Sequence, residues 1–415
     1  MNTMRNSFLV LLTGFLFSVE AQTVELSLSA GYNDQVFYGL TDGAAFSADN
    51  MNWDLAFDVS PFGTAIRIND GKGNRLYQYP LGSIADWDIV DTAGLSASWF
   101  TFYNSDTSWY SGAFNATAEG FDVGWGLYDP LTHNITGDSI YFIQLLDGSW
   151  KKICILNLID GNYNIRFANI DGSEEVETSI GKADYEDKIF VYYNLSEQQI
   201  VDREPAKSSW DITFGSYITE LAPSVYYNVT GALINDGVEV ARAFPVDDPL
   251  TFEDYSGEVF TQAANAIGYD WKVFDMASFT FLITDSTVYF VKDQAGNIWK
   301  ILFTSFEGSS TGNFSFEKLL LSQPTAIESN ATNSIELTIY PNPASDYINI
   351  LFSAKSTGSI VSIVDLNGRI LYSEHGNNAS FNNWQVDISD LPAGFYTVVV
   401  EQDSQVNQAL FSVSH

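Results

Sequence analysis

The sequence predicts a mainly β protein in which two tandem β-rich domains are followed by a small Ig-like β-sandwich. The central part repeats itself at a period of about 150 residues, which indicates a duplicated domain. Its strand-like runs are short and separated by polar glycine turns, while helical periodicity is scarce. The final part of the chain adds about seven more short strand-like runs, which are typical of a sandwich.

The chain opens with a predicted secretory signal peptide over residues 1–21. Arg5 precedes the apolar run from Phe8 to Phe17, and Val19-Glu-Ala21 supplies the small residues of a cleavage site. The apolar run is too short to span a bilayer, and no other run in the sequence approaches the necessary length. We therefore expect an exported protein without a transmembrane segment.

Six motifs recur in the same order along the central part. Asn52-Trp-Asp-Leu-Ala-Phe57 returns as Ser209-Trp-Asp-Ile-Thr-Phe214, and Ile68-Asn-Asp-Gly71 returns as Ile234-Asn-Asp-Gly237. Each copy closes on a predicted hairpin, the first with its turn at Asp147-Gly148. The repeats predict one domain over residues 22–173 and a second over 174–322. A polar linker follows over 323–334.

The C-terminal part, residues 335–415, is predicted to form the sandwich. Tyr340-Pro-Asn-Pro343 cannot be helical, because its prolines lack N–H donors and restrict the residues before them. Ile348–Phe352, Ile360–Val364 and Tyr396–Val400 have the composition of strands. Asn367-Gly368 is a two-residue hairpin signal.

These motifs resemble the type A C-terminal sorting domain of the Bacteroidetes type IX secretion system. The resemblance implies export across the outer membrane with the type IX machinery as a partner, and a final location at the outer-membrane cell surface or outside the cell. The signal peptide at the other end of the chain indicates Sec export as the preceding step. An ordinary Ig-like accessory domain is the alternative. The matching sorting-motif residues are Tyr340, Pro341, Asn342, Pro343, Asp365, Gly368, Arg369, Leu391, Pro392, Gly394 and Tyr396.

Composition excludes some partners. The formal net charge is −34, from 52 acidic and 18 basic residues, so nucleic acid and anionic membranes would repel the chain. No calcium-binding motif or other metal site is evident in the sequence. Its single cysteine, Cys154, lies in an apolar run and is expected to be a core residue rather than a nucleophile.

In the central part, the Trp-Asp openings resemble the haemophore-like HmuY family of Bacteroidetes. So does the element Gly124-Trp-Gly-Leu-Tyr-Asp-Pro-Leu-Thr-His133 with the hairpin after it. Both copies are identified as HmuY-like on these motifs. The resemblance implies a secreted or surface β fold that binds haem between two axial side chains, usually paired His or paired Met.

Haem iron needs axial donors such as His or Met, and the body of the mature protein offers few. The candidates are His133 and Met51 in the first copy and Met276 in the second, where His133 and Met276 take nearly equivalent places. A turn-capping histidine and gap-filling methionines are the alternative interpretations. The cofactor is therefore unknown from sequence, with haem or another tetrapyrrole as the family-based expectation.

Two aromatic features have competing interpretations. Trp53-Asp54 and Trp210-Asp211 could stack on a ligand, but a core tryptophan beside an aspartate that binds a backbone N–H is the favoured interpretation. The runs Trp99–Tyr103 and Trp109-Tyr110 could form a platform for a planar or sugar ligand, or a half-buried strand.

The sequence contains no Gly-x-Ser-x-Gly elbow and no His-Glu-x-x-His pair, so we expect no enzyme. The predicted function is that of a secreted, non-catalytic ligand-binding protein. A structural or adhesive surface module that has lost haem is the second hypothesis. A glycoside hydrolase with an acidic site is the third, and no carboxylate pair in the sequence identifies it.

Overall fold

A computed structural model describes residues 20–323, 337–340, 344–352, 359–365, 369–376, 382–402 and 405–413. The chain divides into two compact units, Met1–Pro324 and Thr325–His415. The predicted mainly β fold is confirmed, since the only helices in the described part are short 3-10 segments. They are η1 (Ala30–Tyr32), η2 (Ile84–Asp86), η3 (Ala113–Asn115), η4 (Ala183–Tyr185) and η5 (Lys207–Ser209).

The first unit contains two large hydrophobic cores besides smaller apolar clusters, and the first core lies between two sheets. Its larger sheet runs in the order β13 (Val176–Gly181), β12 (Asn162–Asn169), β11 (Trp150–Ile159), β10 (Ile140–Gln144), β6 (Arg75–Gln78) and β7 (Thr101–Phe102). The facing sheet runs β15 (Gln199–Val201), β14 (Phe190–Asn194), β4 (Leu55–Asp58) and β5 (Ile66–Ile68). A hairpin of β8 (Gly126–Tyr128) and β9 (Ile135–Gly137) joins the larger sheet through β11.

The second core repeats this plan. Its larger sheet runs β1 (Gln22–Ser27), β23 (Asn313–Ser322), β22 (Ile298–Phe306), β21 (Val288–Lys292) and β18 (Glu239–Ala243). The facing sheet runs β17 (Val225–Ile234), β16 (Ile212–Ala222), β2 (Asp34–Tyr38) and β3 (Ala45–Asp49). A two-stranded hairpin of β19 (Lys272–Asp275) and β20 (Thr280–Ile283) corresponds to β8–β9.

The strands of both cores follow the alternation that their sequences predict. In β12, Tyr163, Ile165 and Phe167 are buried while Asn164 and Arg166 between them are only partly covered. The predicted closing hairpin is confirmed as β10–β11, and Gly148 in its turn has a φ of 84°, which glycine adopts without strain.

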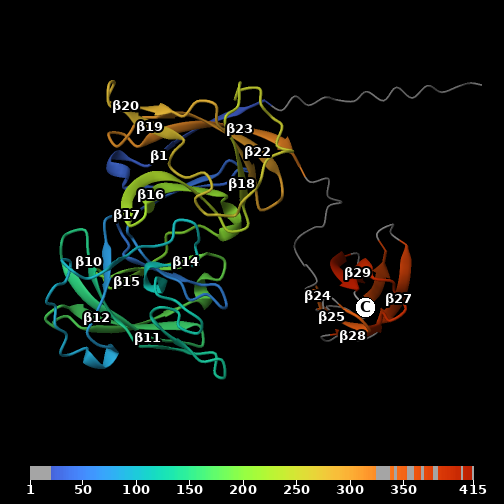
Figure 1. The fold of residues 1–415 in the computed structure, drawn as a ribbon, viewed down its shortest axis with the longest axis horizontal. Coiled ribbons are helices and arrows are strands. Elements are labelled where there is room, and N and C mark those ends of the chain that lie inside the picture. The colour runs from blue at the N-terminus through green and yellow to red at the C-terminus, as the bar shows by residue number, and fades with distance from the viewer. Residues whose placement is uncertain are drawn as a thin grey trace, which may run out of the picture. The chain divides into compact units, whose positions relative to one another are not determined.

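The two copies exchange their opening strands. β14 of the second sequence copy pairs with β4 of the first, with Val191 opposite Phe57. Reciprocally, β2 of the first copy pairs with β16 of the second, with Phe37 opposite Thr213. The first core is thus built from residues 50–201, and the second from 22–49 together with 202–322. Figure 1 shows β1, in blue, within the lobe formed by the yellow and orange strands.

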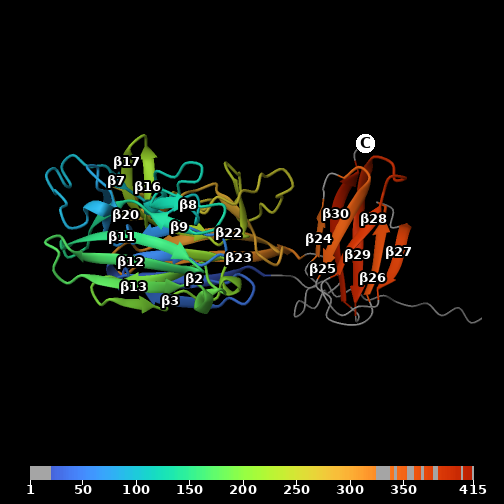
Figure 2. The ribbon, with the colours of Figure 1, turned by 90° about the horizontal axis from the view of Figure 1, so that it is seen from below.

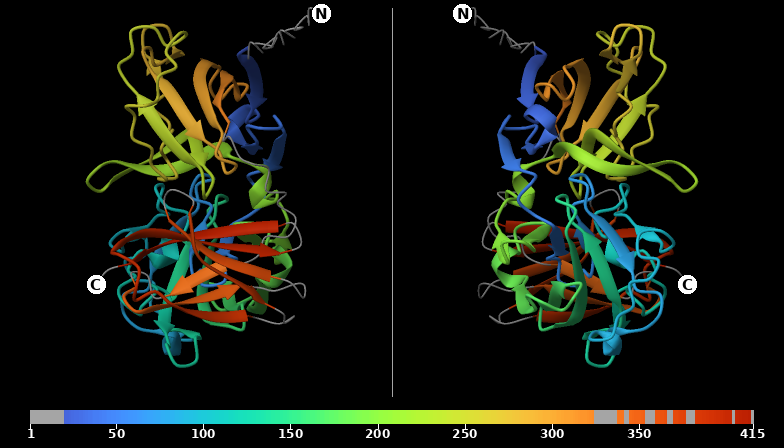
Figure 3. Two further views of the ribbon diagram at one scale, coloured as in Figure 1. Left: turned by 90° about the vertical axis from the view of Figure 1, so that its right-hand side faces the viewer. Right: turned by 90° about the vertical axis from the view of Figure 1, so that its left-hand side faces the viewer.

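The predicted boundary at residues 173 and 174 therefore separates the repeats of the sequence but not the sheets of the structure. Strands β1 and β23, from opposite ends of the body, lie side by side, with Gln22 opposite Lys318 (Figure 3). A further apolar cluster joins the two cores where their four-stranded sheets meet. Its largest members are Phe37, Trp53, Phe190, Tyr192 and Trp210.

The second unit forms the predicted sandwich, and Figure 2 displays its strands. One sheet runs β24 (Leu337–Tyr340), β25 (Tyr347–Phe352) and β28 (Asn382–Asp387), and the other runs β27 (Ile370–Gly376), β26 (Ser359–Val364), β29 (Gly394–Gln402) and β30 (Gln405–Val413). Side chains of both sheets share one core, which includes Ile350 and Val398. The predicted strands at 348–352, 360–364 and 396–400 are confirmed as parts of β25, β26 and β29.

Candidate functional site

The Trp-Asp motifs lie at the exchanged strands. Asp54 is 2% exposed, and its carboxylate accepts hydrogen bonds from the backbone N–H of Leu195 at 2.9 Å and from Asn74 at 2.9 Å, and it pairs with Lys72 at 3.1 Å. In the second core, Asp211 accepts a bond from the N–H of Leu40 at 2.7 Å. The favoured interpretation, an aspartate that binds a backbone N–H beside a core tryptophan, matches this geometry.

Both tryptophan rings of these motifs pack against other side chains. Trp53 meets Tyr192 edge to face at 4.9 Å, and the Arg203 guanidinium lies 5.5 Å from the Trp53 ring. Trp210 is 2% exposed and packs edge to face on Phe37 at 5.1 Å. Neither ring presents an open face to a ligand.

Most side chains of the aromatic runs that were predicted as a possible ligand platform also make contacts within the first unit. Trp109 donates from Nε1 to the carbonyl of Ile234 at 2.8 Å, and the Tyr110 hydroxyl donates to Asp236 at 2.6 Å, so this loop ties the first core to the second. Tyr103 stacks on Tyr226 at 4.3 Å. The Trp109-Tyr110 loop therefore connects the two cores rather than forming a free aromatic platform.

His133 lies in the turn between β8 and β9. The Asp129 carboxylate shapes this turn by accepting bonds from the N–H of Leu131 at 2.8 Å and the hydroxyl of Thr132 at 2.9 Å. These two bonds hold the pKa of Asp129 below its usual range. His133 has a φ of 60°, and its Nδ1 lies 2.6 Å from the hydroxyl of Tyr128. The turn thus fixes an exposed imidazole by one ring nitrogen.

Exposed apolar side chains lie on the same hairpin and in the segment before it. Leu131 is 89% exposed and Leu127 is 57% exposed on the same hairpin. Phe121 is 60% exposed, and its ring lies 6.2 Å from that of Tyr128. Neither Tyr128 nor Phe121 was singled out by the sequence. Tyr128 could have been identified from the sequence, because a short hairpin turn separates it from His133, the only histidine of the body.

The second core carries the corresponding hairpin with different chemistry. The N–H of Phe279 bonds the carbonyl of Asp275 at 2.9 Å with a φ of 55°, just as the N–H of His133 bonds that of Asp129 at 2.8 Å. The prediction that His133 and Met276 occupy nearly equivalent places is therefore wrong. The residue equivalent to His133 is Phe279, three positions after Met276. Met276, 71% exposed, follows the turn aspartate directly.

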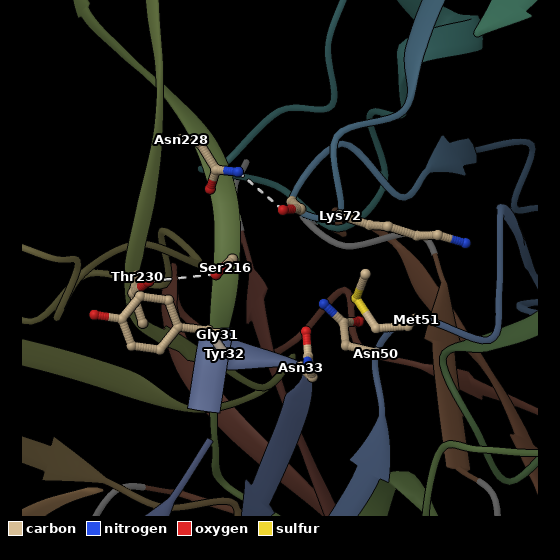
Figure 4. Close-up of a pocket in the computed structure, with 10 residues that line it drawn as sticks. Gly31, Tyr32, Asn33, Asn50, Met51, Lys72, Ser216, Asn228 and Thr230 are labelled. Carbon is tan, nitrogen blue, oxygen red and sulfur yellow. Dashed lines mark hydrogen bonds between the residues drawn. The ribbon is translucent and has the colours of Figure 1, made fainter. Parts of the chain in front are cut away.

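Met51 lies elsewhere, in the segment between β3 and β4. Its side chain lines a pocket at the junction of the two cores (Figure 4). Neither His133 nor Met276 lines this pocket. The three candidate donors thus lie on three separate segments, and the structure does not gather any two of them in a described pocket.

The sorting-motif residues support the sandwich in two places. Arg369 pairs with Asp365 through its side chain at 3.2 Å and through its N–H at 3.0 Å, closing the turn between β26 and β27. The Tyr396 hydroxyl donates to the carbonyl of Pro392 at 2.7 Å, and Leu391 and Gly394 lie in the same turn region. Tyr340 ends β24, and Pro341, Asn342, Pro343 and Gly368 lie outside the described residues. The predicted signal peptide and linker also fall almost wholly outside them.

Cys154 is fully buried in β11, where burial raises the pKa of its thiol to about 12. Within the described residues, no three His, Cys, Asp or Glu side chains are placed to hold a metal ion together. No helix in the described part of the chain has the length and apolar composition that a membrane span requires.

Family comparisons match two parts of the chain. Residues 338–412 match the secretion system C-terminal sorting domain, which indicates interaction with the type IX machinery and a cell-surface or extracellular location. Residues 186–317, which contain β14 to β22 and part of β23, match the HmuY protein family. A comparison with curated proteins finds no match.

Among solved structures, one described as "Biofilm associated protein - BSP domain" is 10% identical. The alignment covers 99% of this chain and 84% of that one with a TM-score of 0.17, a likeness that supports no conclusion about fold or function.

Proposed function

We propose that this chain is a non-catalytic surface or secreted protein that binds haem, or another iron tetrapyrrole, through His133. The sorting-domain match supports the location, and the HmuY match supports a haem-binding-like protein at the level of the family. We further propose that the first copy is HmuY-like too. The support for this is the shared strand order of the two cores and their corresponding turns at Asp129 and Asp275.

The contact between Nδ1 of His133 and the Tyr128 hydroxyl, at 2.6 Å, carries the proposal. In the tautomer whose Nδ1–H donates to the tyrosine oxygen, Nε2 keeps its lone pair and faces away from that bond. A histidine that binds a metal almost always donates its other ring N–H in this way, which orients the ring and raises its basicity. In this tautomer, Nε2 of His133 is free to serve as an axial ligand.

Some neighbouring side chains fit a tetrapyrrole. A porphyrin face is apolar, and exposed apolar surface is offered by Phe121, whose ring lies 6.2 Å from that of Tyr128, and by Leu131, two residues before His133. Bound haem would supply a Lewis-acidic iron for His133 to ligate. Because Phe279 replaces the histidine in the second core, the arrangement supports one haem per chain and one protein ligand.

Titration of the purified protein with haemin tests the proposal. The wild type is expected to give a saturable Soret shift, and His133→Ala is expected to weaken binding at least tenfold. His375→Ala is the matched control, because His375 is an exposed histidine in the sorting unit. Absence of a saturable shift, or equal loss in both variants, would contradict the proposal and favour the structural or adhesive alternative.

A further inference from the structure

The pocket that Met51 lines opens where the two cores meet. Its cavity volume is about 310 Å³. The lining comes from four separate segments: the η1 region, the loop before β4, the turn after β5 and the hairpin β16–β17. Figure 4 shows Asn33, Asn50 and Met51 on one side of it, with Tyr32, Ser216 and Thr230 on the other. Neither sequence copy alone could form this pocket.

The pocket exists because two backbones approach closely. A Cβ atom on Gly71 would lie 2.0 Å from the carbonyl oxygen of Ser216, so only glycine permits this contact. The side-chain amide of Asn228 then donates to the Gly71 carbonyl at 2.9 Å. These contacts join the turn of the first core to the hairpin of the second and hold the pocket walls in place.

The lining is polar but carries no free charge. None of its ten residues is acidic, although the chain contains 52 acidic residues. Its one cation, Lys72, extends away from the other lining side chains, and its ammonium is held by Asp54 at 3.1 Å and by the Trp53 carbonyl at 3.3 Å. The pocket therefore offers little attraction to either a metal cation or a phosphate.

Several hydrogen-bonding groups remain available to a ligand. Within the described residues the side chain of Asn33 makes no hydrogen bond. Asn50 uses only its Oδ1, which accepts from Trp53 Nε1 at 2.9 Å, and Asn228 uses only its Nδ2. The hydroxyls of Ser216 and Thr230 lie 3.3 Å apart. Uncharged amides and hydroxyls that supply both donors and acceptors match a row of ligand hydroxyl groups.

We propose that this junction pocket binds a neutral polyhydroxylated ligand, a single hexose unit of a free sugar or of a glycan chain. The volume suits a ligand of that size, and the side chain of Met51 and the ring of Tyr32 provide apolar surface for the C–H face of a pyranose. This site is independent of His133.

Saturation-transfer NMR and titration calorimetry with glucose, galactose, mannose and N-acetylglucosamine test the proposal on the full chain. We expect saturable binding of at least one of these sugars. Asn33→Ala, which removes unpaired hydrogen-bonding groups, and Met51→Trp, which fills the pocket, are each expected to weaken it at least tenfold. Met276→Trp is the matched control, since it adds the same side chain at an exposed turn.

Binding of none of the four sugars would overturn the proposal, as would binding that survives both pocket variants or is lost equally in the control. Inorganic phosphate and Ca²⁺ serve as charged probes, and preferential binding of either would also overturn it. Haemin binding is expected to be unchanged in Met51→Trp, which separates the outcome of this test from that of the haem proposal.

Discussion

The carboxylate of Asp54 accepts a hydrogen bond from the backbone N–H of Leu195, 141 positions further along the chain, at 2.9 Å. The second core contains the counterpart, in which Asp211 accepts from Leu40 at 2.7 Å. Each bond fastens an exchanged strand to the core that it completes. The repeated Trp-Asp motif thus stabilises the connection between the two copies, which gives a structural reason for its recurrence.

Asp54→Ala is expected to destabilise the first unit strongly. The substitution leaves the ammonium of Lys72, the amide of Asn74 and the Leu195 N–H without their shared acceptor in a buried place. Removing one partner of a buried ion pair costs about 3–5 kcal/mol. Urea unfolding followed by tryptophan fluorescence measures the loss.

Asp187→Ala is the control for that experiment, because Asp187 is exposed and its side chain makes no hydrogen bond or ion pair among the described residues. We expect the control to change the free energy of unfolding by less than about 0.5 kcal/mol. Similar losses in the two variants would show that the Asp54 contacts do not stabilise the exchanged strand.

The free energy of unfolding is expected to depend on pH through Glu204. This carboxyl is buried and accepts bonds from the N–H groups of Ile189 and Phe190 and from the Tyr192 hydroxyl, yet burial raises its pKa from 4.5 to about 7. A raised carboxyl pKa stabilises the folded state fully below about pH 4.5, and this stabilisation is lost as the pH rises through 7. The full change corresponds to about 3 kcal/mol.

Unfolding measured between pH 4.5 and 8 in the wild type and in Glu204→Gln checks this dependence. The variant is expected to show a smaller loss of stability between pH 4.5 and 7. Part of the dependence should remain, because burial also raises the pKa of Asp70 and of Asp211 to about 6. Identical pH profiles in the two proteins would mean that Glu204 does not titrate differently on folding.

The corresponding turns of the two cores predict a gain of function. Phe274→Tyr combined with Phe279→His would copy the Tyr128–His133 pair onto the β19–β20 hairpin, where Val273 and Leu282 are already exposed. Histidine tolerates the φ of 55° at position 279. We expect the double variant to bind two haems per chain, measured by the stoichiometry of a haemin titration.

Phe274→Tyr alone is the control and is expected to keep one haem per chain. If the double variant is folded but also binds only one, the turn geometry would not be sufficient for haem ligation.

Local features were accessible from the sequence. The Asp147-Gly148 turn and the alternation of β12 depend on neighbouring residues, so the hairpins, the strands and the mainly β class could be predicted. The strand exchange could not be predicted, because the apolar pattern of β4 is compatible with pairing to either opening strand, β2 or β14. Only the packed structure selects β14 over β2.

The candidate site was predictable in the same limited sense. His133 stands out as the only histidine of the body, but Tyr128 becomes its partner only when the turn folds. The shared Tyr/Phe-Asp motif of the two copies predicts nearly equivalent places for Met276 and His133, whereas the hydrogen bonds of Asp129 and Asp275 set the correspondence three residues later, at Phe279. The junction pocket brings Asn33 next to Ser216, a proximity that no local motif encodes.

Comparing haemin with metal-free protoporphyrin tests the central claim, ligation of haem iron by His133, most directly. The wild type is expected to bind haemin at least tenfold more tightly than protoporphyrin. His133→Ala is expected to reduce haemin affinity to the protoporphyrin level and leave protoporphyrin affinity unchanged, because the apolar surface of Phe121 and Leu131 remains. Equal affinities for the two porphyrins in the wild type, or a haemin preference that persists in His133→Ala, would contradict it.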